Sequence, residues 1–324
     1  MGLIFSDIPE LLGSNTEVAL RNLSELEERL NLIIEERLAH IDELACAIVG
    51  DGEETDIIKS IILSLKPETY CDGERILNNN QKSINDIYSA LSLRERLLIC
   101  QGISNAYAGG KKIGCETFFE IDTPQVSLEA QGRIAYLKSS YNDTAYIELS
   151  RLVASPRASY YDSITNVCES VYNGTCEYCI LPLETSSDGK LSGFYDLILK
   201  YGFRICAVYD LHHPEASKYT RYGLIGRGFD IKGSNIRVRS RIKLLEFVFE
   251  QDSYPSVADV LSAAEFCGMR LRRIDTLNST SNRGSKSPLI CPIFRVESAD
   301  LDTFLTFMAI DCPTVRPLGI YTQI

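Results

Sequence analysis

Hydrophobic residues recur every three or four positions between residues 22 and 48, which is the spacing of one face of a helix. This apolar face consists of Leu23, Leu26, Leu30, Ile33, Ile34, Leu38, Ile41, Leu44 and Ile48. Most of the glutamates between them fall on the opposite, polar side. Gly50 and Gly52 end the pattern, so the sequence predicts one long amphipathic helix over residues 22–48.

Two shorter helices are expected after the long one. Thr55 is a suitable N-cap for a helix that runs to Leu65 and stops before Pro67. Residues 67–82 have the composition of a loop. Ser92 and Glu95 form a capping-box pattern, which predicts a third helix ending near Tyr107. Residues 1–110 are therefore predicted to be a helical domain, and residues 111–131 a linker.

Strand and helix patterns alternate over residues 132–230. Strands are expected at 133–137, 157–161, 178–181, 203–209 and 222–225, and helices at 144–153, 164–172 and 194–201. This alternation predicts a parallel sheet covered by helices, with ligands bound at the carboxyl ends of the strands.

The remaining residues, 231–324, show a different order. Strands are expected at 236–249, 271–277, 289–296 and 315–322, with helices at 256–267 and 301–310, whereas residues 278–287 read as a loop. The order is the βαββαβ arrangement of ferredoxin-like domains. The predicted fold class is thus multidomain: an α domain, an α/β lobe and an α+β domain.

A buried strand at 178–181 is followed by a polar stretch that contains Thr185, Ser186 and Gly189. Small hydroxyl residues after an apolar run indicate a turn at the carboxyl end of a strand. A helix is expected just beyond Ser192. Backbone N–H groups at a helix start, with hydroxyls beside them, suit a small carboxylate ligand.

Composition narrows the class of protein. The chain has 324 residues, of which 45% are hydrophobic and 24% charged, as is usual for globular domains. A net charge of −11 argues against nucleic acid as a partner. No apolar run is long enough for a membrane helix, and the first residues lack the basic start of a secretory signal. Eleven cysteines without framework spacing indicate reduced thiols and a cytoplasmic location.

A zinc site is one interpretation of Cys176, Cys179 and the nearby His212 and His213. However, Cys179 falls in an apolar strand, where a buried thiol behaves as a small hydrophobic side chain. No second Cys-x-x-Cys pair accompanies the first. Neither a metal nor a cofactor is therefore expected.

Residues 182–189 resemble the Pro-Ile-Glu-Asn-Ser-x-x-Gly signature of prephenate dehydratases: Glu184, Ser186 and Gly189 match, and Thr185 takes the place of the asparagine. Upstream, residues 134–137 resemble the opening strand of that family, and Ser140 lies where the family has a glycine-rich turn.

Downstream, residues 220–222 match the Thr-Arg-Phe motif of the same family. The resemblance covers roughly residues 132–324. It implies a catalytic role for Thr220 and a carboxylate contact for Arg221. Ser140, Glu184, Thr185 and Ser186 are implied to contact the substrate.

The N-terminal helices resemble the chorismate mutase domain of bifunctional P-proteins. Arg21 and Arg37 lie about where that family has two substrate-binding arginines, and Gln101 is a candidate for its glutamine. The family's lysine falls near Ile48. An alternative interpretation of Arg21 and Arg37 is surface charge paired with the glutamates of the same helix.

The C-terminal region resembles the ACT domain, which senses phenylalanine in this family. Its two effector motifs are replaced here by residues 255–258 and 275–278. A sheet that mediates dimerisation is the alternative interpretation.

Only ten residues, Asp210 to Tyr219, separate the strand at 203–209 from Thr220. The resembled family builds a second lobe at this point, and ten residues are too few to bury a core. We therefore expect a homodimeric protein that binds a small aromatic carboxylate (prephenate, chorismate or an aromatic amino acid), with dehydratase activity weakened or lost. The alternative is an active chorismate mutase or dehydratase whose site a second subunit completes.

Overall fold

The computed structural model describes residues 14–49, 88, 90–107, 129–214, 218–228, 243–250, 255–277, 288–297, 299–312 and 315–324. The predicted helix at 55–65, the loops at 67–82 and 278–287 and most of the 111–131 linker lie outside these residues. So does the first half of the strand predicted at 236–249.

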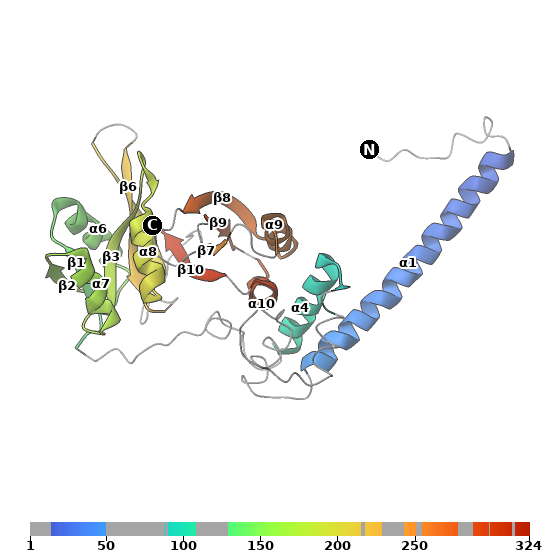
Figure 1. Ribbon diagram of the computed structural model, residues 1–324, viewed down its shortest axis with the longest axis horizontal. Helices are drawn as coiled ribbons and strands as arrows, with labels where there is room; N and C mark the ends of the chain where they lie inside the picture. Colours follow the sequence, from blue (N-terminus) through green and yellow to red (C-terminus); the bar gives the residue numbers. More distant parts are fainter. Residues whose placement is uncertain are drawn as a thin grey trace.

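A single mixed sheet runs through the described part of the chain (Figure 1). Its strands, in spatial order, are β2 (Arg157–Tyr161), β1 (Arg133–Leu137), β3 (Tyr178–Thr185), β6 (Tyr219–Gly226), β5 (Arg204–His212), β10 (Arg316–Gln323), β7 (Lys243–Glu250), β9 (Leu289–Arg295) and β8 (Arg270–Leu277). The short β4 (Gly189–Lys190) pairs with β3 at the side. Strands β1, β2 and β3 are parallel, as predicted, whereas β6 lies antiparallel between β3 and β5.

The helices are α1 (Ser14–Val49), α4 (Leu93–Tyr107), α6 (Ser140–Ser150), α7 (Ile164–Tyr172), α8 (Ser192–Tyr201), α9 (Val257–Phe266) and α10 (Leu301–Asp311). The capping box expected at Ser92 is formed, and a capping box is also found at Ser256, where α9 begins. Helix α6 starts four residues before the predicted position, because the Ser139 side chain accepts a hydrogen bond from the Asn142 N–H and caps the helix there.

Strand β3 is longer than the sequence predicts. The prediction ended this strand at Leu181 because the apolar run stops there, at Pro182, and a polar stretch follows. The structure continues it to Thr185, so the predicted end was wrong. The register against β6 shifts between Pro182 and Glu184, and a proline is tolerated at such a bulge.

The C-terminal strands have the spatial order β10-β7-β9-β8, and every neighbouring pair is antiparallel. Together with α9 and α10 they give the expected βαββαβ sequence of elements. This is the ferredoxin-like arrangement.

The last strand joins the two halves of the sheet. Thr322 and Gln323 of β10 pair in parallel with Ala207 and Val208 of β5, while the other edge of β10 pairs with β7. A side chain at Gly319 would collide with the carbonyl oxygen of Ile205, so glycine permits this close approach. The sheet therefore crosses the boundary predicted at residue 230; the division into domains stays a prediction.

Three apolar clusters fill the two faces of the sheet. On one face, residues of α7 and α8 pack over both halves, with Leu181 and Leu244 in the same cluster. On the other face, α6 covers the first half through Ala145 and Leu149. On the C-terminal half, a third cluster combines residues of α9 and α10 with residues of α4.

The N-terminal helices attach to the C-terminal half. Helix α4 lies against α10, where Arg96 forms a buried ion pair with Asp311. Helix α1 crosses α4 so closely that a side chain at Gly102 would collide with Ala45. The rest of α1 extends away from the sheet (Figure 1). Within the described ranges, no helix has the length and apolar character needed to cross a bilayer.

Candidate functional site

Several of the predicted site residues meet where the parallel strands end. Thr185, the last residue of β3, lies opposite Thr220 of β6 in register. His213 directly follows β5, and Ser140 and Tyr141 begin α6. We refer to Ser140, Tyr141, Thr185, His213 and Thr220 as the edge cluster. Carboxyl ends of parallel strands are the usual position for ligands in open α/β sheets.

The centre of the edge cluster is a hydrogen bond between the His213 Nε2 and Thr220 Oγ1 atoms, 3.0 Å apart. The ring of Tyr141 meets the imidazole edge-on, with ring centroids 4.9 Å apart and planes at 86°. Tyr141 keeps 51% of its surface exposed. An imidazole in contact with a hydroxyl can accept or donate a proton, so this pair can perform acid–base chemistry or orient a bound ligand.

The predicted ligand residues Thr185 and Ser186 take part in closing the adjacent turn. Thr185 Oγ1 donates to the Asp188 carboxylate over 2.8 Å and accepts from the Asp188 N–H over 3.0 Å. These hydroxyl contacts, with one from Ser187, lower the pKa of Asp188. The exposed Ser186 exchanges two hydrogen bonds with the backbone of Tyr219. The turn is thus fixed in shape and open to solvent.

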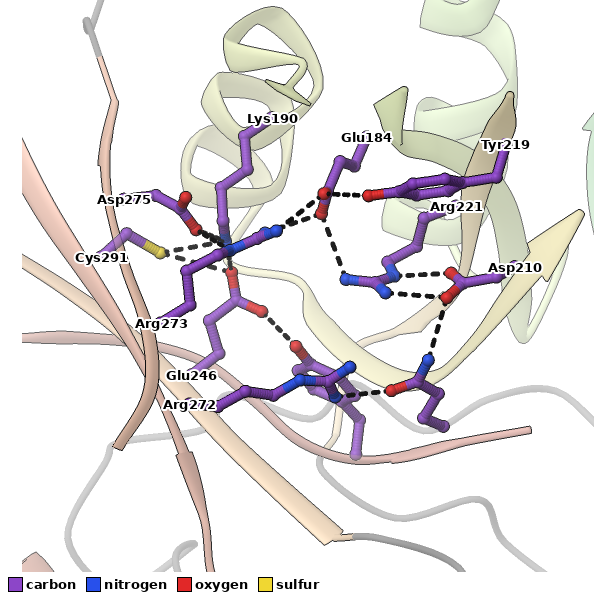
Figure 2. A network of polar contacts seen from close by, with 12 residues as sticks. Glu184, Lys190, Asp210, Tyr219, Arg221, Glu246, Arg272, Arg273, Asp275 and Cys291 are labelled. Atoms are coloured by element: carbon purple, nitrogen blue, oxygen red, sulfur yellow. Dashed lines mark hydrogen bonds and ion pairs between the residues drawn. The ribbon is translucent and has the colours of Figure 1, made fainter. Parts of the chain in front are cut away.

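Arg221 follows Thr220 in the chain but points to the other face of the sheet. Its guanidinium donates twice to Asp210, from Nε (2.7 Å) and Nη2 (2.8 Å), and once to Glu184, from Nη1 (3.1 Å) (Figure 2). The fork geometry with Asp210 is the strong bidentate form. The cation predicted to hold a substrate carboxylate is therefore bound to two carboxylates of the protein itself.

Glu184 is the acceptor at the centre of this network and only 3% exposed. It accepts two hydrogen bonds from Arg273 of β8, at 2.8 and 2.7 Å, and one from the Tyr219 hydroxyl at 2.7 Å. Burial alone would raise the pKa of Glu184. The hydrogen bonds from Arg273 and Tyr219, with the charge of Arg221, outweigh burial and lower that pKa to about 2. The carboxylate is consequently held ionised.

A second buried ion pair continues the network toward the C-terminal half. Lys190 pairs with Glu246 of β7, and its Nζ atom lies 3.2 Å from the Cys291 sulfur (Figure 2). The same Nζ atom lies 3.1 Å from the Tyr195 hydroxyl. Burial would lower the pKa of Lys190, but the charge of Glu246 beside it raises that pKa. The network thus ties β4 to β7 and β9.

The sequence reasoning missed several residues of these sites. It considered His213 only as a metal ligand, although its place after a strand is a signal for the edge cluster. It did not single out Arg273, Lys190 or Glu246, which lie far from Glu184 along the chain. Only the three-dimensional arrangement brings these charges together.

The candidate residues of the N-terminal helices lie elsewhere. Arg21 is exposed on α1, Arg37 pairs with Glu95 of α4, and Gln101 is partly buried on α4. Arg21 and Arg37 are sixteen residues apart on one helix, which corresponds to about 24 Å. A small dicarboxylate cannot contact both arginines of one chain.

The described cysteines are all free thiols. Across the described ranges, no group of three or more His, Cys, Asp or Glu side chains is arranged to hold a metal ion.

One known protein family matches part of the α/β half of the chain. The prephenate dehydratase family model matches residues 134–213. The matched span runs from β1 to His213 and contains Ser140, Glu184, Thr185 and Ser186, but ends before Thr220. The chain therefore contains a prephenate dehydratase-like segment.

Solved structures give weak similarities. Prephenate dehydratase from Streptococcus mutans is 17% identical with a TM-score of 0.47, covering 59% of this chain and 98% of that one. Prephenate dehydratase from Arthrobacter aurescens, in complex with L-Phe, is 13% identical with a TM-score of 0.42, covering 58% and 89%. GqqA, described as a novel type of quorum quenching acylase, is 15% identical with a TM-score of 0.43, covering 59% and 94%. No curated protein matches the sequence.

Proposed function

We propose that this chain is a prephenate dehydratase-related protein of aromatic amino-acid metabolism, which binds a small aromatic carboxylate at the edge cluster in the cytoplasm and has lost most or all dehydratase activity. The observation that carries the proposal is the separation of Thr220 from Arg221. Thr220 faces His213 in the edge cluster, whereas Arg221 is bound by Asp210 and Glu184 on the other face.

The edge cluster has the chemistry of a carboxylate site. Thr220 presents its hydroxyl beside the His213 imidazole, and Thr185, opposite Thr220, shapes the adjacent turn. The first turn of α6 begins at Ser140, beside Tyr141 and His213, and helix N-termini favour anions. The half-exposed Tyr141 ring offers a face for an aromatic group.

Dehydration of prephenate makes stricter demands than binding. It needs an acid positioned at the departing hydroxyl and a site from which water is excluded. Ser140, Tyr141 and Ser186 are all exposed. Among the described residues between Tyr209 and Thr220, 210–212 and Tyr219 pair as the ends of β5 and β6, with Asp210 opposite Arg221, and these paired residues do not form a second wall.

The test combines turnover with binding. Purified protein is incubated with prephenate while phenylpyruvate is measured, and its melting temperature is recorded with prephenate, chorismate, Phe, Tyr and Trp. We expect turnover far below the roughly 1 s⁻¹ of an ordinary enzyme, together with a higher melting temperature for one of these ligands.

The variant Thr220→Val should abolish the stabilisation by ligand. Thr276→Val, at an exposed threonine on β8, is the matched control and should retain it. Ordinary turnover of prephenate would contradict the loss of dehydratase activity. An unchanged melting temperature with all five ligands would contradict the binding role.

A homodimer is the second part of the proposal, because α1 exposes an apolar face that a second copy would cover. Its exposed large side chains, each at least 37% accessible, are Val18, Leu23, Leu26, Leu30, Leu32, Ile33, Ile34 and Leu38. Contiguous apolar surface of this kind marks contact sites between proteins. The same helix is already buried against α4 at Ile41 and Ala45.

Pairing of two α1 helices in antiparallel orientation would also address the separation of Arg21 and Arg37, because Arg21 of one copy could then approach Arg37 of the other. This geometry supports chorismate mutase activity as the alternative function. Measuring chorismate consumption by the protein and by Arg21→Gln distinguishes the two. Turnover that disappears in the variant would favour the mutase, and absence of turnover favours binding alone.

A further inference from the structure

The edge strand β8 contains a bulge that changes the direction of one arginine. Arg270 pairs with Arg295 of β9, Leu271 with Phe294, and Arg273 with Ile293, so Arg272 has no residue opposite it. Consecutive residues of a regular strand point to opposite faces, and a bulge removes this alternation. Arg272 and Arg273 both contact residues on the face that carries the Glu184 network (Figure 2).

The bulge concentrates positive charge on that face. Arg270 and Arg295 lie directly opposite each other on neighbouring strands, so their side chains project from the same side of the sheet. Like charges in this position destabilise a sheet. Partial burial lowers the pKa of Arg272. The positive charges of the nearby Arg221 and Arg295 lower it further.

The other cations nearby are neutralised by the protein. Arg221 is bound by Asp210 and Glu184, and Arg273 by Glu184 and Asp275. Lys190 is bound by Glu246.

Arg270, Arg272 and Arg295 differ from these cations. Among the residues that the structure describes, none of the three forms an ion pair with an acidic side chain. All three are exposed.

Arg272 is held in place by a neutral group. Its Nη1 donates to Oε1 of Gln323, while Nε2 of Gln323 donates to Asp210 over 2.9 Å. Asp210 also receives both hydrogen bonds from Arg221. Gln323 therefore orients Arg272 without neutralising its charge.

We propose that Arg270, Arg272 and Arg295 bind a small oxyanion, a carboxylate or a phosphate group, on this face of the sheet. Guanidinium groups match both anions through paired N–H donors. The anion would neutralise the opposed Arg270 and Arg295 and supply the acidic partner that Arg272 lacks. The site lies on the opposite face from Thr220 and does not depend on the function proposed for the edge cluster.

The experiment measures binding of inorganic phosphate and of succinate by isothermal titration calorimetry, at an ionic strength fixed with sodium chloride. We expect at least one probe to bind with 1:1 stoichiometry, and the tighter of the two identifies the anion. Arg272→Gln and Arg295→Gln should each weaken binding roughly tenfold or more, because each removes a charge-assisted contact.

Arg316→Gln is the matched control, since Arg316 is exposed at the start of β10. It pairs with Val248 of β7, whereas Arg295 pairs with Leu244 near the opposite end of that strand. This variant should leave the affinity unchanged. Equal affinity in the wild type and in Arg272→Gln would overturn the proposal. So would absence of binding by both probes at millimolar concentration.

Discussion

Thr220 and Arg221 are consecutive residues of β6, yet their side chains lie on opposite faces of the sheet and bind different partners. Thr220 contacts His213 beside α6, whereas Arg221 contacts Asp210 and Glu184 on the face covered by α7 and α8. The alternation of a strand produces this separation. A motif that reads as one catalytic unit along the sequence thus divides between two sets of contacts in the structure.

Replacing Arg221 should destabilise the fold. Arg221→Met leaves Asp210 and Glu184 without one of their cations in a buried position, and removing one partner of a buried ion pair costs about 3–5 kcal/mol. Urea unfolding followed by circular dichroism measures the loss. The exposed Arg316→Gln serves as the control; a similar small change in both variants would show that Arg221 has no structural role.

Stability should fall in acid partly because of Glu184. The pKa of Glu184 is about 2 in the fold, below the value of about 4.3 expected in the unfolded chain. Its contribution is therefore fully present above pH 5 and is lost as the pH falls toward 2, by about 3 kcal/mol in total. Urea unfolding of the wild type and of Glu184→Gln, at pH 6 and at pH 3, measures how much of the loss of unfolding free energy in acid comes from Glu184. An equal loss in both proteins would refute it.

Charged substitutions on α1 should separate the proposed dimer. An aspartate at Leu26 or Leu30 would be buried without a partner in the contact between subunits, at a cost of several kcal/mol. Sedimentation velocity should show a dimer for the wild type and for the control Glu27→Gln, and a monomer for Leu26→Asp. A wild type that sediments as a monomer at micromolar concentrations would exclude this contact.

The ion pair between Arg96 and Asp311 should fix α4 to α10. Asp311 also accepts a hydrogen bond from the Tyr88 hydroxyl, 2.8 Å away, and burial raises the pKa of Asp311. Arg96→Met alone should cost about 3–5 kcal/mol, because a buried carboxylate loses its cation. The double variant Arg96→Met with Asp311→Leu should regain most of that stability. A double-mutant cycle from urea unfolding measures the coupling, and additive losses would contradict it.

Local sequence patterns predicted most of the elements. Capping residues such as Ser92 and Ser256, and the alternating apolar positions of the strands, act over a few residues and can be read directly. The end of β3 was misjudged because a bulge at Pro182 depends on the neighbouring strand, which the local sequence does not reveal. The single sheet was also not predicted, since the pairing of Thr322 with Ala207 joins residues far apart in the chain.

The sites were predicted less completely than the fold. Thr185 and Ser186 were predicted because they follow a strand, and Ser186 and Thr220 because they match a motif. The bonds of Glu184 to Arg273 span 89 positions, and no local pattern indicates them. The direction of Arg272 depends on a bulge defined by two paired strands. Long-range charge pairing and strand register are set by tertiary structure, so the sequence alone does not specify them.

The position of β10 has a consequence for folding during synthesis. Until residues 316–323 leave the ribosome, β5 in the first half and β7 in the second each keep an open edge that the same segment must later fill. Unpaired strand edges in a nascent chain invite association with other chains. We therefore expect a ribosome-bound intermediate stalled before Arg316 to recruit chaperones, and to release them once this segment has emerged.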